Sequence, residues 1–375
     1  MVASFLVINH RNIAMKYFFC VMFVFAAFIN YLQAAEPRVI ELKGHSAFWY
    51  DNTGDDNSND VAVAFSPDSK RHVTVCGNGT ILLWDAETGK ELEKLQEENR
   101  DFHEEFRYGF TVAFSKNGKN FVVSNSSASQ IWEAESGRLL HKFAGGAGQF
   151  SMDGEKFVLG DKGTVRIFDV DSGKELRKFE GGDNATFSHD GKKIITAKRN
   201  SQTILILDAE SGKELLKIEG SEFILSPDGK KIVSWGVTGK GWETAWSAVW
   251  DAESGKKLLK IDGWAGALSP DGKKIITRMI VPKLESVIVY VESGKEQYRL
   301  LGDAVFLPDG KRIIAGAGVF DRLNTPVRIF DAESGKELQK FETSQPVYPS
   351  AISSDGRKIA LVGLRGYVAL LVLEE

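Results

Sequence analysis

A short turn sequence recurs eight times along the chain and limits its fold more than any other feature. Its consensus is Phe-Ser-Pro-Asp-Gly-Lys, in which proline presets φ, aspartate can hydrogen-bond the backbone ahead, and glycine supplies the left-handed position of a tight hairpin. The copies centre on Asp68-Ser69, Asn117-Gly118, Asp153-Gly154, Asp190-Gly191, Asp228-Gly229, Asp271-Gly272, Asp309-Gly310 and Asp355-Gly356. Their spacing, from 36 residues (117 to 153) to 49 (68 to 117), is typical of a repeat architecture.

A second turn alternates with the first and has the consensus Trp-Asp-Ala-Glu-Ser-Gly-Lys-Glu-Leu. Its glycine occurs seven times, at Gly89, Gly137, Gly173, Gly212, Gly255, Gly294 and Gly335. Short apolar or alternating runs, such as Val165-Arg166-Ile167-Phe168, separate the turns and predict β-strands. Each cycle therefore contains two hairpins and four strands, a to d, which is the content of one propeller blade.

The unequal numbers of the two turns predict how the ring closes. Eight blades need eight c strands and eight d strands, but only seven c–d turns join them. The missing d strand is predicted at residues 38–44 and the missing c strand at residues 367–373. We therefore expect an all-β, eight-bladed β-propeller of four-stranded antiparallel blades, closed by pairing of the N-terminal strand with the last blade. Deletion of either end should destabilise the whole ring.

Two further positions repeat with the blades. Small residues near the ends of the a strands fit the crowded centre of a ring; they are Ala64, Ala113, Ala185, Ala267, Ala304 and Ala351. Aromatic residues end most c strands, where we expect them to pack between blades; they are Trp84, Trp132, Phe168, Trp250, Tyr290 and Phe330.

Residues 1–35 predict a secretory signal peptide, and residues 36–375 the propeller. Lys16 precedes thirteen mostly apolar residues (17–29), and small residues follow at positions 34 and 35. The pattern fits best if translation starts near Met15. A retained membrane anchor is the alternative, but the apolar run is shorter than the roughly 20 residues that span a bilayer. We expect an exported protein, periplasmic or extracellular, without stable membrane insertion after cleavage.

Composition narrows the range of functions further. The formal net charge is -4 and no block of lysine or arginine occurs, so the chain has no electrostatic footprint for nucleic acid. Removal of the signal would leave Cys76 as the one remaining cysteine, which excludes an intramolecular disulfide. The oxygen-rich residues 51–60 could hold calcium, but they lack the spacing and closing glutamate of an EF-hand loop, and we interpret them as a solvated loop.

Three strand ends carry a recognisable signature: Leu83-Trp84-Asp85, Ile131-Trp132-Glu133 and Val249-Trp250-Asp251. They resemble the Trp-Asp repeats of the WD-repeat (WD40) β-propeller family, and the first turn looks like that of its bacterial, exported members. The resemblance covers residues 38–374 and implies an interaction platform. The glycine–histidine pair of the family survives only at Gly44-His45. We therefore expect the family's buried Asp–His–Ser–Trp hydrogen-bond network to be absent.

A more distant similarity, to quinoprotein dehydrogenases, supplies the alternative function: a propeller enzyme or a small-ligand-binding propeller. Those proteins place a docking tryptophan three residues after the lysine of a related turn. Here that position holds Glu93, His141, Arg177, Leu216, Leu259, Tyr298 and Gln339. Two cysteines, Cys20 and Cys76, cannot form a Cys-x-x-Cys-His haem site. We expect no catalytic residue, cofactor or metal.

Connections of unequal length predict the face that binds a partner. The a–b and c–d turns are uniformly tight and share one face, whereas the d–a and b–c connections vary widely on the other. The long connections carry Trp, Tyr and Arg, the residue types that dominate interface hot spots. The partner-binding residues selected on this basis are Trp49, Tyr50, Tyr108, Trp242, Trp246 and Arg322. Packing over the ring as caps is the alternative. The expected function is a non-catalytic WD40-repeat scaffold for a protein or peptide.

Overall fold

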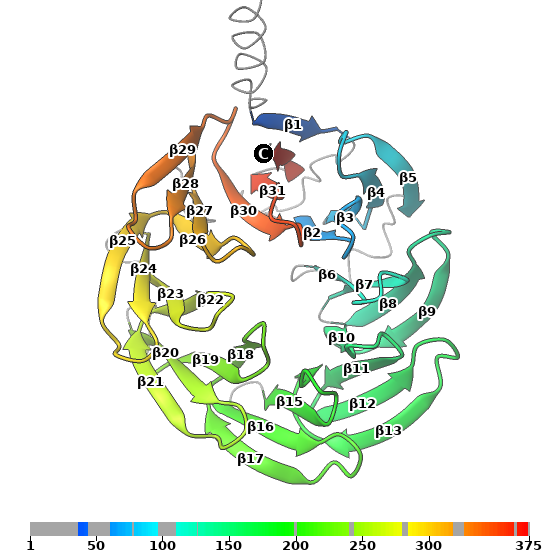
Figure 1. The fold of residues 1–375 in the computed structure, drawn as a ribbon. Coiled ribbons are helices and arrows are strands. Elements are labelled where there is room, and N and C mark those ends of the chain that lie inside the picture. The colour runs from blue at the N-terminus through cyan, green and yellow to red at the C-terminus, as the bar shows by residue number, and fades with distance from the viewer. Residues whose placement is uncertain are drawn as a thin grey trace, which may run out of the picture.

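The repeats form a closed ring of β-strands. The computed structural model describes residues 37–43, 61–76, 79–96, 110–125, 127–198, 201–239, 244–279, 284–317, 326–363 and 366–373. Within these ranges, strands β1 to β32 form eight four-stranded antiparallel sheets. The sheets surround a central opening (Figure 1), and the inner strand of each blade lies next to it. The predicted all-β, eight-bladed propeller is confirmed.

The strands of the first four blades are given from the centre outward. Blade one has β2 (Val61–Phe65), β3 (Arg71–Cys76), β4 (Ile81–Asp85) and β5 (Glu91–Gln96). Blade two has β6 (Thr111–Phe114), β7 (Asn120–Ser124), β8 (Ala128–Glu133) and β9 (Leu139–Ala144). Blade three has β10 (Gly148–Phe150), β11 (Lys156–Asp161), β12 (Thr164–Asp169) and β13 (Glu175–Glu180). Blade four has β14 (Asn184–Phe187), β15 (Lys193–Lys198), β16 (Thr203–Asp208) and β17 (Glu214–Glu219).

The other four blades follow in the same order. Blade five has β18 (Glu222–Leu225), β19 (Lys231–Val237), β20 (Ala245–Asp251) and β21 (Lys257–Asp262). Blade six has β22 (Trp264–Leu268), β23 (Lys274–Met279), β24 (Glu285–Tyr290) and β25 (Glu296–Leu301). Blade seven has β26 (Asp303–Phe306), β27 (Arg312–Gly316), β28 (Val327–Asp331) and β29 (Glu337–Phe341). Blade eight has β30 (Val347–Ile352), β31 (Lys358–Gly363), β32 (Val368–Val372) and β1 (Arg38–Leu42).

Blade eight closes the ring as predicted. Its strands lie in the order β1-β32-β31-β30, so the first strand of the chain is its outer strand. The pairing runs without interruption from Arg38 opposite Val372 to Leu42 opposite Val368. The two ends of the propeller therefore complete one sheet, and their noncovalent pairing is what closes the ring.

Side chains of the outer strands pack against the second turn of the next blade, and this contact needs glycine. Gly89 has a φ of +66°, and a Cβ there would lie 2.7 Å from Ile40 Cγ2 of β1. Gly335 has a φ of +69°, and a Cβ there would lie 3.0 Å from the Tyr298 ring. The equivalent contacts in other blades join His141 to Gly173, Phe179 to Gly212, Leu216 to Gly255 and Leu259 to Gly294. The repeated glycine thus serves both the turn and the contact between blades.

The apolar core consists of clusters that adjacent blades share. Trp84 of blade one packs with Leu42 and Val362 of blade eight, and Trp132 of blade two packs with Val75 of blade one. Three more c-strand aromatics lie in equivalent clusters with the preceding blade: Phe168, Trp250 and Phe330. The predicted packing of these five aromatic residues between blades is confirmed.

Tyr290 is the exception and corrects the sequence alignment by one residue. The Gly294 N–H donates to the Tyr290 carbonyl, the bond that the other second turns make to Asp or Glu. Val289 therefore stands at the tryptophan position. The Tyr290 hydroxyl donates to Glu333 Oε1 of blade seven at 3.2 Å, and Lys274 Nζ lies 5.4 Å from the centroid of its ring. Tyr290 contacts the following blade through polar groups instead of packing against the preceding one.

A serine–aspartate pair fixes the first turn. In blade five, Ser226 Oγ donates to Asp228 Oδ1 at 2.6 Å and accepts from the Lys231 N–H at 2.8 Å. The Ser226 hydroxyl is the main cause that lowers the pKa of Asp228. Serine makes the same bond to Asp or Asn in six other blades. Blade seven lacks this serine, and there Arg312 Nε donates to Asp309 Oδ2 at 2.7 Å.

Acid should weaken the fold through these turns. Because the native pKa of residues such as Asp68, Asp153, Asp190 and Asp228 is lowered, the folded state binds protons less readily than the unfolded state. Their stabilisation is complete above the unfolded pKa of about 4 and is lost as the pH falls through the lower native values. We expect the melting temperature, followed by circular dichroism, to fall steeply below about pH 4. A level melting temperature down to about pH 2 would contradict this mechanism.

Loss of the apolar anchor of β1 should weaken ring closure. Leu42 is 7% exposed and packs between blades eight and one. Leu42→Ala should lower the free energy of unfolding by about 2–4 kcal/mol. Leu92, which is 48% exposed on the outer strand β5, is the matched control. Leu92→Ala should change the free energy of unfolding by about 0.5 kcal/mol or less. Urea denaturation measures both variants, and equal effects would show that β1 does not secure the ring.

Candidate partner-binding face

The two faces of the ring differ in how the strands are connected. All eight a–b turns and all seven c–d turns have five residues between strands, as from Phe65 to Arg71. The d–a connections range from one residue (263) to eighteen (43–60), and the b–c connections from two (162–163) to ten (317–326). Since strands within a blade alternate in direction, the five-residue turns share one face and the variable connections share the other. We call the second the loop-rich face.

Five of the six partner-binding residues predicted from the sequence lie outside the described residues. Trp49 and Tyr50 belong to the d–a connection that enters blade one, and Tyr108 to the one that enters blade two. Trp242 and Arg322 belong to the b–c connections of blades five and seven. All five fall in connections of the loop-rich face, and their role in binding stays a prediction. The oxygen-rich residues 51–60 are also outside the described part.

The sixth residue, Trp246, is a strand residue and not the loop residue that the sequence suggested. It lies in β20, is 3% exposed and packs in the cluster between blades four and five. Lys260 Nζ lies 4.1 Å from the centroid of its ring and pairs with Glu219 of blade four at 3.1 Å. The position of Trp246 is therefore that of a packing residue between blades. Tyr348 lies in the inner strand β30.

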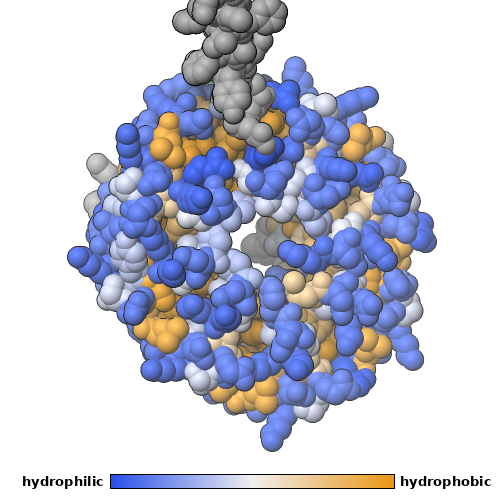
Figure 2. Space-filling view, viewed as in Figure 1, coloured by the Kyte–Doolittle hydropathy of each residue, from blue (hydrophilic) through white to orange (hydrophobic). Residues whose placement is uncertain are grey.

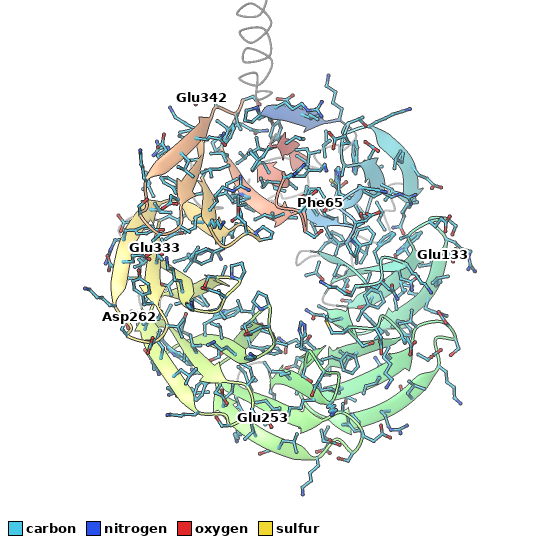
Figure 3. The ribbon with its side chains drawn as sticks, in the orientation of Figure 1. Phe65, Glu133, Glu253, Asp262, Glu333 and Glu342 are labelled. Atoms are coloured by element: carbon cyan, nitrogen blue, oxygen red, sulfur yellow. The ribbon has the colours of Figure 1, made fainter. Side chains whose placement is uncertain are left out.

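The starts of the inner strands bring together side chains that sequence reasoning did not select. Inner strands begin at the loop-rich face, beside the central opening (Figures 1 and 2). Phe65, at the other end of inner strand β2, is labelled near this opening, whereas the turn residues Glu253 and Glu333 lie farther out (Figure 3). At the equivalent position near the start, blades one to three have Ala62, Thr111 and Ala147, and blades four to eight have Asn184, Glu222, Trp264, Asp303 and Tyr348.

We call these last five residues, with Arg278 of β23, the mouth cluster. Asn184 Nδ2 donates to Glu222 Oε2 at 3.1 Å and links blades four and five. Arg278 Nε donates to Asp303 Oδ1 and links blades six and seven. Trp264 lies directly opposite Arg278 in the pairing of β22 with β23. Glu222 is exposed, while the other five are partly buried.

The two carboxylates of the mouth cluster differ in environment. Burial raises the pKa of Asp303, and the neighbouring Arg278 guanidinium opposes that shift. Asp303 forms an ion pair with Arg278, and Glu222 Oε2 accepts a hydrogen bond from the side-chain amide of Asn184. Counting back three or four places from the Phe, Leu or Ile that ends each inner strand would have revealed these positions.

The described residues contain no group of three His, Cys, Asp or Glu side chains placed to hold a metal ion. No helix among the described residues is long and apolar enough to cross a membrane. The quinoprotein similarity would require a tryptophan as the third residue of each outer strand that follows a second turn. Some of the residues at this position, such as His141 and Tyr298, pack on the turn glycine of the next blade.

The fold defines the protein as a β-propeller with eight blades of four antiparallel strands. The family model for the WD domain, G-beta repeat, matches residues 38–85, which run from β1 to the end of β4. This match and the eight repeated blades make the chain similar to WD-repeat (WD40) propellers and support that family. A comparison with curated proteins finds no matching relative.

Part of the family's buried hydrogen-bond network is present, which corrects the expectation of its absence. Trp84 Nε1 donates to Thr74 Oγ1 at 2.7 Å in blade one. Trp250 Nε1 donates to Ser234 Oγ at 2.8 Å in blade five, and that hydroxyl donates to the Glu219 carbonyl. Blade two carries Val123 at the hydroxyl position, and Trp132 Nε1 has no hydrogen-bond partner there. The Trp–Ser/Thr half of the network thus occurs only where both partners are present.

Replacement of Trp246 should damage the fold whether or not a partner binds. Trp246→Ala removes a buried ring from the interface of blades four and five, so the free energy of unfolding should fall by about 3–5 kcal/mol. Leu215, 45% exposed on β17, provides the control, and Leu215→Ala should be nearly neutral. Denaturant unfolding measures both, and wild-type stability of Trp246→Ala would contradict its packing role.

Proposed function

We propose that this WD-repeat propeller is a non-catalytic scaffold that binds a protein or peptide through its loop-rich face. The difference between the two faces carries the proposal. Fifteen turns on one face keep the same five-residue length, whereas the connections on the other vary from one to eighteen residues. Insertions that collect on one face of a repeat protein often form its binding surface.

Residue types in these connections support the same face. Trp49, Tyr50, Tyr108 and Trp242 belong to connections that the repeat itself does not require. Trp, Tyr and Arg contribute a disproportionate share of binding energy at protein interfaces. We propose these four residues and Arg322 as contact residues.

We also propose that the protein is exported, to the periplasm or outside the cell. Lys16, the apolar residues 17–29 and the small residues at 34 and 35 support removal of a signal peptide. Strand β1 begins at Arg38, so cleavage before Glu36 leaves the closing strand intact. A scaffold in that compartment would meet its partner in the cell envelope or medium.

Affinity capture from the envelope fraction tests the binding proposal. The bait is the exported protein, and the variants are Trp242→Ala and Arg322→Ala. A contact residue of hot-spot strength contributes about 2 kcal/mol, so each variant should lose about thirtyfold in affinity for a captured partner. Leu215→Ala, on the outer strand β17 away from the loop-rich connections, should bind like the wild type.

One control separates binding from folding, and two outcomes would contradict the proposal. Each variant must melt at the wild-type temperature before its binding is compared. A partner retained by both variants but lost by Leu215→Ala would move the site to the outer rim. Failure of the folded wild-type protein to capture any partner would contradict the scaffold function.

A further inference from the structure

We propose that Ser69 and Ser354 select blade eight as the neighbour of blade one when the ring closes. Ser69 lies in the first turn of blade one, between β2 and β3, and Ser354 in the first turn of blade eight, between β30 and β31. The two turns come from opposite ends of the propeller, so they meet only when the ring closes. We call this pair the serine lock. It acts in the assembly of the ring and is independent of what the loop-rich face binds.

Ser69 stands at the turn position where the other seven blades have glycine. Its φ is +60°, in the left-handed region, and the seven glycines have φ between +65° and +77°. L side chains rarely adopt this conformation, so a serine there is strained unless its side chain makes compensating contacts. Ser69 is 3% exposed, and its Oγ lies 2.9 Å from Ser354 Oγ. The strained position is therefore also a contact with blade eight.

Ser354 departs from the repeat in a matching way. It stands where four other blades have the proline of the first turn. A Cβ on Gly356 of blade eight would lie 3.3 Å from Pro308 Cδ of blade seven, and Gly118 and Gly310 face the proline of the preceding blade in the same way. In the closing joint, serine replaces both the proline and the glycine of this contact.

Three hydrogen bonds cross the closing joint in series. The Ser354 hydroxyl donates to the Pro67 carbonyl at 2.7 Å. Because a hydroxyl has one proton, the bond between the two serines uses the proton of Ser69. The Asp355 N–H donates to Ser69 Oγ at 3.4 Å. The bonds alternate between residues of blade eight and residues of blade one, and loss of either hydroxyl breaks two of the three.

The same pair disfavours a wrong neighbour. If blade one followed blade seven in a smaller ring, Ser69 would face Pro308 in place of Ser354. A Cβ alone would be close to that proline ring, as at Gly356, and the Ser69 hydroxyl would be packed against apolar atoms. The turn glycines are less selective, because they lie opposite proline, asparagine or histidine in different joints. Ser69 therefore accepts blade eight and resists a blade that carries proline.

A double-mutant cycle tests whether the two hydroxyls act together. Ser69→Ala and Ser354→Ala should each reduce the folding equilibrium constant about tenfold, because each breaks two hydrogen bonds. The double variant should lose about fivefold less than the product of the single losses, since the bond between the serines is counted twice in that product. Pro308→Ala, at the position of Ser354 in blade seven, is the matched control. Its loss should simply multiply with that of Ser69→Ala.

A second pair of variants tests the selection of blade eight. Ser354→Pro places the residue of the other joints against Ser69 and should reduce the folding equilibrium constant by about tenfold or more. Addition of Ser69→Gly recreates the proline–glycine contact of blades seven and eight and should restore most of that loss. Urea denaturation of the full exported protein, followed by tryptophan fluorescence, measures all variants.

The outcomes decide between a lock and ordinary turn packing. Single losses that multiply in the serine cycle would overturn the lock. Equal stability of Ser354→Pro with and without Ser69→Gly would overturn the selection of blade eight. If Ser354→Pro does not fold, recovery of a folded chain by Ser69→Gly supports the lock, and absence of that recovery contradicts it.

Discussion

Seven of the eight joints between blades depend on the contact between an outer strand and the turn glycine of the following blade. At the joint between blades eight and one, the contact is made by Ile40 of β1 against Gly89. Strand β1 comes from the N-terminal end of the propeller, whereas the other three strands of blade eight come from its C-terminal end. Because β1 joins blade eight without a covalent connection, the first and last segments must meet before blade eight is complete and blade one has both neighbours. In a closed ring every sheet is complete and every blade packs against two neighbours, so each contact between blades contributes to the stability of the whole.

The outer edges show how the same turn also protects the ring. A β-bulge follows the second turn in all seven blades that have it; in blade one, Trp84 lies opposite Glu91 and Leu83 opposite Glu93, which leaves Leu92 unpaired. Several exposed leucines occupy this bulge, namely Leu92, Leu176, Leu215, Leu258 and Leu338. They are a consequence of the irregular edge, which hinders pairing with other chains. Strand β1 follows no such turn and pairs without a bulge.

The fold was predictable because its signals are local, and the errors arose where they are not. Short turn sequences rich in aspartate and glycine, four of them with proline, mark the hairpins within six residues, and counting turns was enough to predict ring closure. Nothing local marks where a long b–c connection ends, so Trp246 was assigned to a loop although β20 starts at Ala245. Tyr290 was matched to other aromatics instead of being counted back from Gly294. The Trp–hydroxyl bonds escaped because Thr74 lies ten residues before Trp84, but Ser234 lies sixteen before Trp250.

The residues that could identify a partner are, for the same reason, those that the repeat does not determine. Blades with the same turns and the same joints present nearly the same surface, so a ligand can distinguish them only by departures from the repeat. On the face of five-residue turns those departures are few, and polar side chains follow the same order in each blade. On the loop-rich face they include both the variable connections and the mouth cluster, from Asn184 to Tyr348. A ring that is nearly symmetric in its packing is therefore asymmetric where recognition would occur.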